Sequence, residues 1–371
     1  MNNRQYHVNE SVKSRVERYL RQLIENKGVI GGRGNSNISL VKRYLNEYNI
    51  GYNEVSKKGH KSIITRKTDI VLNSHVDVVP GNDNQFVSYV DSNRLYGRGS
   101  ADALGCAAAL IVCTQELKEM GREVTLMIVS DEESGGLYGT KHLLNKKFNK
   151  EELDAVKYAI VGEPTESFGF SVREKGILRL EVAVYGERGH PEKENVVNAI
   201  HIASDVINEV KNSDLLNSKD EFYSRLLHIN PTRIEGGVAS NIVPDKVVIE
   251  YDIRFAYGIT IEQILGIFEG LKKKYFCKFK VLKSRNASYV DTKSEYFELL
   301  NRVAKNPEKI YTNGASDYSY FFEKNIDGVV YGVKGYGWHK DNEYVELDSV
   351  HEYIENIVNF VLEVDGNGNG Y

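Results

Sequence analysis

The sequence predicts an α/β protein in which a smaller α+β domain interrupts a larger domain. Three short apolar runs rich in β-forming residues are each followed by a helical pattern, which is typical of strands in an α/β sheet. A later segment has the order strand–helix–strand–strand–helix–strand, which is the ferredoxin-like arrangement. The chain of 371 residues is longer than a usual single domain, so we expect two domains.

The elements of the larger domain follow from apolar periodicity and from the glycines between them. Amphipathic spacing predicts two helices near the start, and an alanine-rich pattern predicts a third, entered through a glycine-punctuated loop. In chain order the predicted elements are helices 12–25 and 38–49, a strand ending at His75, helix 103–120, and strands 124–129 and 158–161.

The pattern changes near Gly176, where alternation with a period of two begins. The six elements predicted after it are strand 177–185, helix 195–210, strands 232–234 and 246–255, helix 261–275 and strand 277–282. We therefore assign residues 177–284 to an inserted domain. The larger domain then comprises residues 1–176 and 285–371.

Composition favours an ordinary globular enzyme. A net charge of −4 gives no reason to expect a nucleic-acid surface, and no apolar run approaches the length of a membrane span. The first ten residues are polar, unlike a signal peptide. Cys106, Cys113 and Cys277 cannot all pair, and no CxxC spacing is present, so we expect reduced core cysteines in a cytoplasmic protein.

Each of the three apolar runs ends in side chains that can bind a metal. His75 ends the first run, Glu132 and Glu133 follow the second, and Glu163 follows the third. In open α/β sheets the site lies outside the carboxyl ends of the strands, so these residues are expected to converge. Asp77 lies two residues after His75 and can face the same way, which would let one of the two orient the other.

Further candidates complete a metal centre. Asp102 lies in a glycine-containing loop at a helix start, where its carboxylate could bridge two ions. Glu132 and Glu133 are adjacent and face differently, so one can bind metal while the other acts as general base. With Glu163 and His339, the ligands are two histidines and three carboxylates, one of which comes from the Glu132–Glu133 pair. This ligand set suits two zinc ions.

Each residue also has an ordinary structural explanation. A histidine at a strand end is more often hydrogen-bonded filler than a ligand. Acidic residues after a strand are often the first turn of a helix, and the Gly-Arg-Gly-Ser-Ala-Asp run could be a loop with a helix cap. Taken together, however, these explanations require several coincidences at the one edge where an α/β sheet places its active site.

Four runs, in this order, resemble those of one co-catalytic zinc family, which comprises acetylornithine deacetylase, succinyl-diaminopimelate desuccinylase, aminoacylase and carboxypeptidase G. The resemblance covers nearly the whole chain. The runs are Ser74-His75-Val76-Asp77-Val78-Val79-Pro80, Tyr96-Gly97-Arg98-Gly99-Ser100-Ala101-Asp102, Asp131-Glu132-Glu133-Ser134-Gly135-Gly136 and Val161-Gly162-Glu163-Pro164.

The resemblance implies a zinc-peptidase-like catalytic domain with a mixed sheet and flanking helices, and it implies a role for each residue of the site. His75 and Glu163 would hold one zinc, and His339 and Glu133 the other, with Asp102 bridging them. Glu132 would be the general base and Asp77 would orient His75. A cis peptide bond between Asp102 and Ala103 is also implied.

The inserted domain would then be a ferredoxin-like lid and dimerisation domain. The resemblance implies that His190 reaches the partner subunit's site and stabilises the oxyanion. Asn241 and Arg254, together with Gly314 and Ser316 of the Gly-Ala-Ser-Asp run, would bind the substrate. The chain departs from the family pattern at Leu104-Gly105, where Lys-Gly is common, at Pro191, and at Lys340-Asp341-Asn342-Glu343, which lacks the common Thr-Pro.

The predicted function is a zinc-dependent amidohydrolase of amino-acid metabolism that cleaves the amide bond of an N-acyl amino acid. Two Zn²⁺ ions per subunit are expected, with Co²⁺ or Mn²⁺ as substitutes, in a homodimer that binds neither nucleic acid nor membrane. The alternatives are a dipeptidase or aminopeptidase, and a hydrolase that releases an amino acid from a carrier protein or biosynthetic peptide. An alternative of another class is a metal-free binding or regulatory homologue.

Overall fold

The computed structural model describes residues 5–31 and 34–368, and the chain divides into two compact units. The first unit comprises Met1–Val172, Val290–Ile310 and Ser316–Tyr371, and the second comprises Arg173–Tyr289 and Tyr311–Ala315. The sequence placed the ends of the inserted segment at 177 and 284. The structure places them slightly further out and adds the short segment 311–315 to the second unit.

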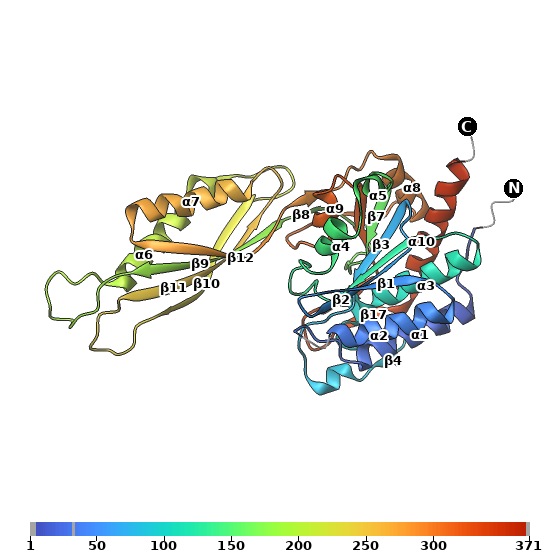
Figure 1. Cartoon of the computed structure of the whole chain (residues 1–371), viewed down its shortest axis with the longest axis horizontal. Coiled ribbons are helices and arrows are strands. Elements are labelled where there is room, and N and C mark those ends of the chain that lie inside the picture. The colour runs from blue at the N-terminus through green and yellow to red at the C-terminus, as the bar shows by residue number, and fades with distance from the viewer. Residues whose placement is uncertain (1–4, 32–33, 369–371) are drawn as a thin grey trace. The chain divides into compact units, whose positions relative to one another are not determined.

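A mixed sheet forms the centre of the first unit, as the sequence predicts (Figure 1). Its order is β1-β2-β6-β3-β7-β15-β8-β13, with β14 also paired to β8. The four strands β6, β3, β7 and β15 run parallel to one another, and the pairs β1–β2, β2–β6, β15–β8 and β8–β13 are antiparallel. The strands are β1 Tyr52–Lys57, β2 His60–Thr65, β3 Ile70–His75, β6 Thr125–Val129, β7 Tyr158–Val161, β8 Phe170–Glu174, β13 Ser288–Tyr289, β14 Lys309–Thr312 and β15 Gly328–Tyr331.

Helices flank this sheet. α1 begins after Asn9, whose side chain accepts the backbone N–H of Val12 and so caps the first turn. The helices of this unit are α1 Glu10–Glu25, α2 Gly34–Glu47, α3 Cys106–Glu119, α4 Thr140–Lys146, α5 Lys150–Asp154, α8 Glu295–Val303, α9 Tyr318–Phe322 and α10 Leu347–Gly368. Short helical turns span Asp83–Phe86 and Ser100–Gly105, the latter leading into α3.

A second, smaller sheet of the first unit has the order β16-β17-β5-β4. Its strands are β4 Tyr89–Asp91, β5 Arg94–Tyr96, β16 Gly335–Tyr336 and β17 Tyr344–Glu346. One tyrosine per strand lies opposite the next, so that the rings of Tyr336, Tyr344, Tyr96 and Tyr89 stack or tilt against one another at 5.3, 5.2 and 4.7 Å between successive centroids. This sheet places the residues after β5 beside those between β16 and β17.

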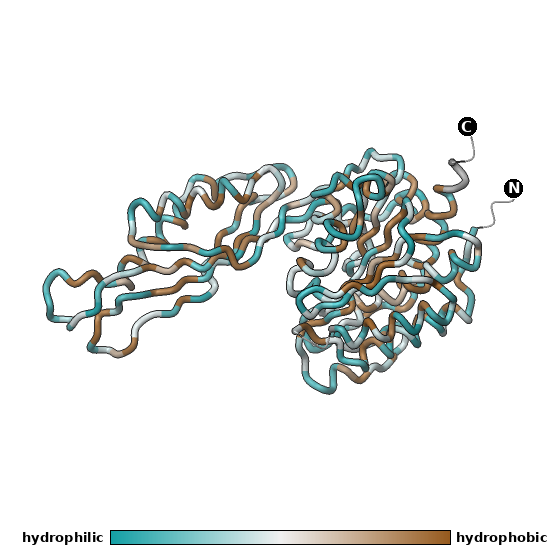
Figure 2. Tube along the Cα trace, in the orientation of Figure 1, coloured by the Kyte–Doolittle hydropathy of each residue, from teal (hydrophilic) through white to brown (hydrophobic). Residues whose placement is uncertain are grey.

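The hydrophobic core lies between the central strands and their helices, which Figure 2 shows as apolar strands under a more polar exterior. Helix residues 100–119 are long and apolar enough to cross a membrane by length and composition, but 94% of the most apolar stretch is buried inside the protein. That burial is typical of a core helix. Cys106, Cys113 and Cys277 are buried and unpaired, as expected of core thiols.

The second unit has the predicted ferredoxin-like order of elements. These are β9 Gly176–Tyr185, α6 Ala199–Lys211, β10 Leu227–Gly236, β11 Lys246–Phe255, α7 Ile261–Lys274 and β12 Cys277–Arg285, with a short helical turn over Asp214–Asn217. The antiparallel sheet has the order β10-β11-β9-β12. Its apolar residues and those of α6 and α7 form a core of their own.

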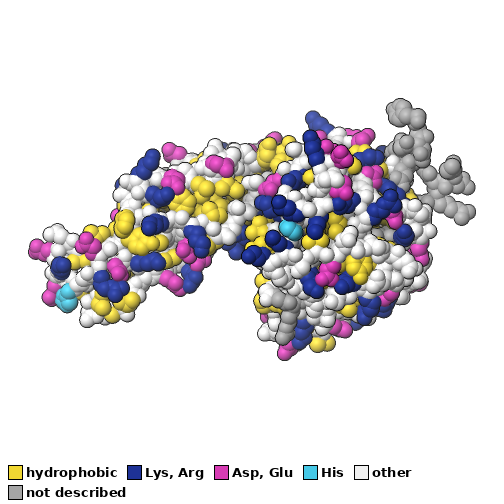
Figure 3. Space-filling model, in the orientation of Figure 1, with side chains coloured by type: hydrophobic (Ala, Val, Ile, Leu, Met, Phe, Trp, Pro, Cys, Tyr) yellow, Lys and Arg dark blue, Asp and Glu magenta, His cyan; other side chains and the backbone are white. Residues whose placement is uncertain are grey.

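Acidic and basic side chains are interspersed on the face of the protein seen in Figure 3. A small net charge of −4 agrees with this mixture. No single-sign field therefore dominates that face.

Candidate metal centre

The carboxyl ends of three parallel strands deliver four of the candidate ligands. His75 is the last residue of β3, Glu132 and Glu133 lie in the turn after β6, and Glu163 follows β7 by two residues. Because β3 pairs in parallel with both β6 and β7, these residues meet at one edge of the sheet.

Asp102 lies between two histidines. One of its carboxylate oxygens is 3.2 Å from His75 Nε2, and the other is 3.2 Å from His339 Nε2. The loop that carries Asp102 passes through Gly99, whose φ of +82° and close contact with Val78 leave no room for a side chain. The peptide bond between Asp102 and Ala103 is cis, as the resemblance implied.

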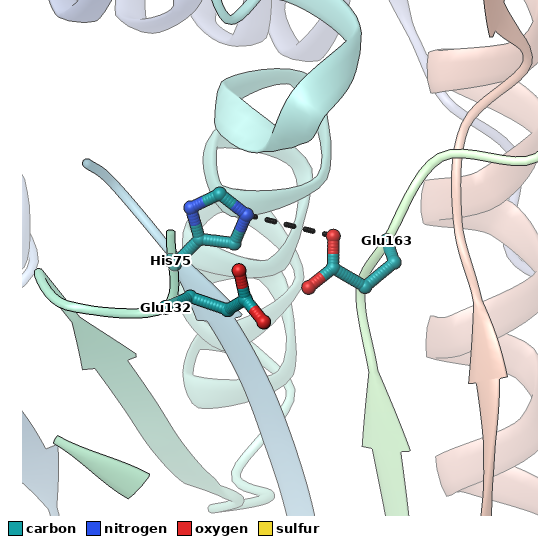
Figure 4. A group of neighbouring side chains, drawn as sticks. All are labelled: His75, Glu132 and Glu163. Atoms are coloured by element: carbon teal, nitrogen blue, oxygen red, sulfur yellow. Dashed lines mark ion pairs between the residues drawn. The ribbon is translucent and has the colours of Figure 1, made fainter. Parts of the chain in front are cut away.

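The ligand atoms fall into two groups, each gathered within 4.8 Å. His75, Glu132 and Glu163 form one group, and Figure 4 shows their imidazole and carboxylates facing a common space. Asp102, Glu133 and His339 form the other. His75 Nε2 is 3.5 Å from Glu163, and His339 Nε2 is 3.3 Å from Glu133. Asp102, through its two oxygens, connects the groups.

Hydrogen bonds fix the ring of His75 but do not satisfy the atoms that face the cluster. His75 Nδ1 lies 2.9 Å from the carbonyl oxygen of Asp77, which places a proton on Nδ1 and directs Nε2 toward the carboxylates. Within the described part of the chain, buried His75 Nε2 and Glu133 Oε1 make ion-pair contacts of 3.2 to 3.5 Å but no hydrogen bond. Buried polar atoms are rarely left without a hydrogen bond, so this nitrogen and this carboxylate oxygen fit a cation site.

The charges of the cluster depend on one another. Burial opposes protonation of His75, but the negative charges of Glu163 and its neighbours hold the His75 pKa well above its usual value. The ion pairs of His339 with Asp102 and Glu133 raise the pKa of His339 to about 10. Burial raises the pKa of Glu133 to about 7 and that of Glu163 well above its usual range. Without another cation, protonated His75 and His339 offset the negative charge of the carboxylates. Divalent ions would supply the same positive charge.

Comparison with known proteins shows the family of this chain. The sequence pattern of peptidase family M20/M25/M40 matches residues 71–363. The chain belongs to this family. It is 25% identical over 325 residues to a succinyl-diaminopimelate desuccinylase of Rickettsia bellii, covering 80% of this chain and 82% of the relative. It is 28% identical over 328 residues to a LysW-lysine/LysW-ornithine hydrolase of Sulfurisphaera tokodaii, covering 86% and 87%.

The fold is also that of solved structures of this kind. A tripeptidase from Staphylococcus aureus superposes with a TM-score of 0.75 at 21% identity, covering 95% of this chain and 98% of that one. The protein is therefore a hydrolase of the M20/M25/M40 family that acts on amide or peptide bonds.

Asp77 contacts both His75 and the acidic turn that carries Glu132 and Glu133. It is fully buried, and its side chain lies 3.5 Å from His75 Nδ1. Its two carboxylate oxygens accept the backbone N–H groups of Glu132, at 3.2 Å, and Glu133, at 3.1 Å. The contribution of Asp77 is thus wider than the orientation of His75 that the sequence predicts.

Asp77→Asn is expected to weaken metal binding by roughly tenfold to a hundredfold, the usual effect of losing a group that orients metal ligands. The amide has a single acceptor oxygen, so its NH₂ group would face a backbone donor of the acidic turn. Metal titration of the stripped protein measures this loss. Unchanged affinity would show that the turn keeps its geometry without the second acceptor.

The remaining predicted site residues lie mostly in the second unit. His190 is exposed, and its Nδ1 accepts the backbone N–H of Glu192 at 3.4 Å. Asn241 is exposed, whereas Arg254 is ion-paired at 2.7 Å with Asp252 of its own strand. The second unit also contains Gly314. Their roles toward a substrate stay predictions.

Ser316 belongs to the first unit and is buried. Its hydroxyl accepts the backbone N–H of Tyr318 at 3.2 Å, at the start of α9. In this structure Ser316 therefore supports the beginning of a helix, and substrate contact by its side chain stays a prediction.

One residue of the centre was not among the sequence candidates. Glu343 is buried behind the Asp102 loop and accepts four hydrogen bonds from it. It lies four residues after His339, in the run Lys340-Asp341-Asn342-Glu343 that departs from the family pattern. The sequence signal for this residue was a charge between the ligand His339 and the strand that follows it. Charged residues are usually exposed to solvent, so this signal did not indicate a buried role.

Proposed function

We propose that the protein is a di-zinc amidohydrolase that removes the acyl group from an N-acyl amino acid. The observation that carries the proposal is Asp102, whose two carboxylate oxygens each lie 3.2 Å from the Nε2 atom of a different histidine. A carboxylate in this position suits a bridge between two cations. Membership of a peptidase family supplies the reaction class, hydrolysis of an amide or peptide bond.

The residues that would hold the two ions follow from the two ligand groups. His75 and Glu163 would bind one zinc, His339 and Glu133 the other, and Asp102 both. One nitrogen and two carboxylates per ion, with water in the open position, is a zinc-type ligand set, and Co²⁺ or Mn²⁺ are substitutes.

The chain's own residues would then carry the proton transfers. When bound, the ions polarise the amide carbonyl and lower the pKa of a water molecule. Glu132, whose carboxylate belongs to the His75 group, takes the proton of the attacking water and delivers it to the leaving nitrogen. His75 and Asp77 are buried at this edge, whereas the His339 side chain is about half exposed.

The second unit would complete the site as a lid. Asn241, Arg254 and Gly314, with Ser316, would bind the free carboxylate of the substrate, and His190 of the partner subunit would stabilise the oxyanion in a homodimer. His190 is exposed, and its hydrogen bond within the described residues is to the backbone of its own loop, which supports a role outside its own unit.

Two alternatives act on other amide bonds. Similarity to the LysW-lysine/LysW-ornithine hydrolase favours release of an amino acid from a carrier protein, and the fold shared with a tripeptidase favours a short peptide. The desuccinylase relative favours the small N-acyl amino acid. A metal-free binding homologue is opposed by the complete ligand set, and metal content per chain decides that point.

A substrate screen tests the proposal. Zinc-loaded protein is offered acetyl, succinyl and aminoacyl amides of several amino acids, and release of the free amino acid is measured. We expect turnover of at least one acetyl or succinyl amide, abolished by chelation and restored by zinc. Turnover confined to aminoacyl amides would favour the peptidase alternative, and a protein that binds no metal would contradict the proposed function altogether.

A further inference from the structure

A buried carboxylate lies behind the loop that carries Asp102. Glu343 is 2% exposed and precedes β17 of the small sheet. Its Oε2 accepts Arg98 Nη1 at 2.8 Å and the backbone N–H of Gly99 at 2.9 Å. Its Oε1 accepts the backbone N–H of Ala101 at 3.2 Å and that of Asp102 at 3.0 Å.

All four partners of this carboxylate are donors. Both oxygens of Glu343 must therefore be acceptors, which only an ionised carboxylate provides. An amide of the same shape would turn its NH₂ group toward two N–H donors on one side. A buried donor left without an acceptor costs more than the hydrogen bond it replaces. The loop thus requires the charge at position 343 and not only its volume.

The same group connects Asp102 to the segment of His339. Arg98 Nη1 also donates to the carbonyl oxygen of Lys340, the residue after His339, at 3.0 Å. The backbone carbonyl of Glu343 accepts the N–H of Gly97 at 3.1 Å. Two ligands of one metal group, which lie far apart in sequence, are therefore held together by Arg98 and Glu343 and by the pairing of β5 with β17.

We infer that Glu343 is a positioning residue that fixes the backbone of Asp102 against the His339 segment and thereby sets the affinity of the group Asp102, Glu133 and His339 for its ion. The inference rests on the proposed metal centre and adds to it a residue that touches neither ion nor substrate. Its carboxylate faces the backbone of Asp102, whereas the Asp102 carboxylate faces the two histidines.

The chain offers a matched control for the loss of a buried ion pair. Glu116 on α3 pairs with Arg15, and both side chains are less than a tenth exposed. Glu116 also accepts the hydroxyl of Tyr6 at 2.8 Å, and among the described residues no hydrogen bond or ion pair joins its side chain to a ligand loop. Glu343→Gln and Glu116→Gln therefore remove the same charge from similarly buried pairs, and only the first change affects the Asp102 loop.

The test measures metal binding and loop order separately. Chelator-stripped wild type, Glu343→Gln and Glu116→Gln are titrated with Co²⁺ and followed by visible absorption. Amide hydrogen exchange of residues 99–102 is measured on the metal-free proteins. We expect Glu343→Gln to bind the Co²⁺ ion of the group Asp102, Glu133 and His339 at least about tenfold more weakly than wild type does. We also expect the amide hydrogens of Ala101 and Asp102 to exchange faster than in wild type. Glu116→Gln should lower the unfolding temperature while both Co²⁺ affinities stay at the wild-type value.

The outcomes separate this inference from the proposed function. If wild type binds two Co²⁺ ions and Glu343→Gln binds both equally well, Glu343 is merely structural and the inference is wrong. If wild type binds none, the proposed function fails and the inference fails with it. If Glu343→Gln does not fold, Glu343→Asp decides, because the shorter side chain keeps the charge but withdraws it from the Ala101 and Asp102 N–H groups. Wild-type Co²⁺ affinity in Glu343→Asp would then overturn the inference, and a several-fold loss would support it.

Discussion

Glu132→Gln is expected to lower turnover of the best acyl substrate by about a hundredfold or more while two metal ions remain bound. The glutamine keeps the length and shape of the side chain but cannot take a proton from water. The backbone N–H of residue 132 still bonds to Asp77, so the turn should keep its place. Initial rates and metal content of the same preparation measure the two effects.

Glu133→Gln is the matched control, because it makes the same change one residue further along the same turn. The buried Oε1 of Glu133 lies 3.3 Å from His339 Nε2 but makes no hydrogen bond within the described residues. We therefore expect this variant to lose one metal ion more readily than wild type. If metal analysis gave the reverse pattern, with Glu132→Gln losing metal, the roles of the two residues would have to be exchanged.

His190→Ala is expected to depress turnover more than substrate affinity, because an oxyanion exists only in the transition state. The residue belongs to the second unit, whereas the strands that carry the ligands belong to the first, and it is exposed. Steady-state kinetics with a saturable substrate separates the two parameters. A loss confined to KM would instead assign His190 to substrate binding.

Mixing variants tests whether His190 acts across a dimer. A His190→Ala subunit paired with a His75→Ala subunit would give one site with both defects and one with neither. Subunit exchange between the two inactive proteins should therefore restore part of the activity. A strictly monomeric active enzyme, or no recovery after exchange has been verified, would contradict the shared site. His190 would then only support the loop before α6, as its contact with the Glu192 backbone suggests.

Four residues of the site could be predicted from sequence because they lie at strand ends. His75 ends an apolar run, Glu132, Glu133 and Glu163 follow closely after such runs, and the parallel pairing of β3, β6 and β7 aligns those ends. The ferredoxin-like order of the second unit could also be predicted from sequence, because alternation of apolar and polar residues and helical periodicity are local properties of the chain.

The roles of Glu132 and Glu133 could be assigned only from the tertiary structure. Sequence indicates only that Glu132 and Glu133 face different ways. The structure places Glu132 with His75 and Glu163, and Glu133 with Asp102 and His339, because Asp77 accepts both of their backbone N–H groups and fixes the turn.

The sequence by itself determined the class of site, since the ligand types and the strand ends are local. Only the tertiary structure decided how His339 and Asp102 meet and what holds them there. Neither residue ends a parallel strand; the small sheet brings their segments together, and Glu343 with Arg98 fixes them. A buried charge is stable only if distant residues supply its partners, and no local pattern records which residues those are.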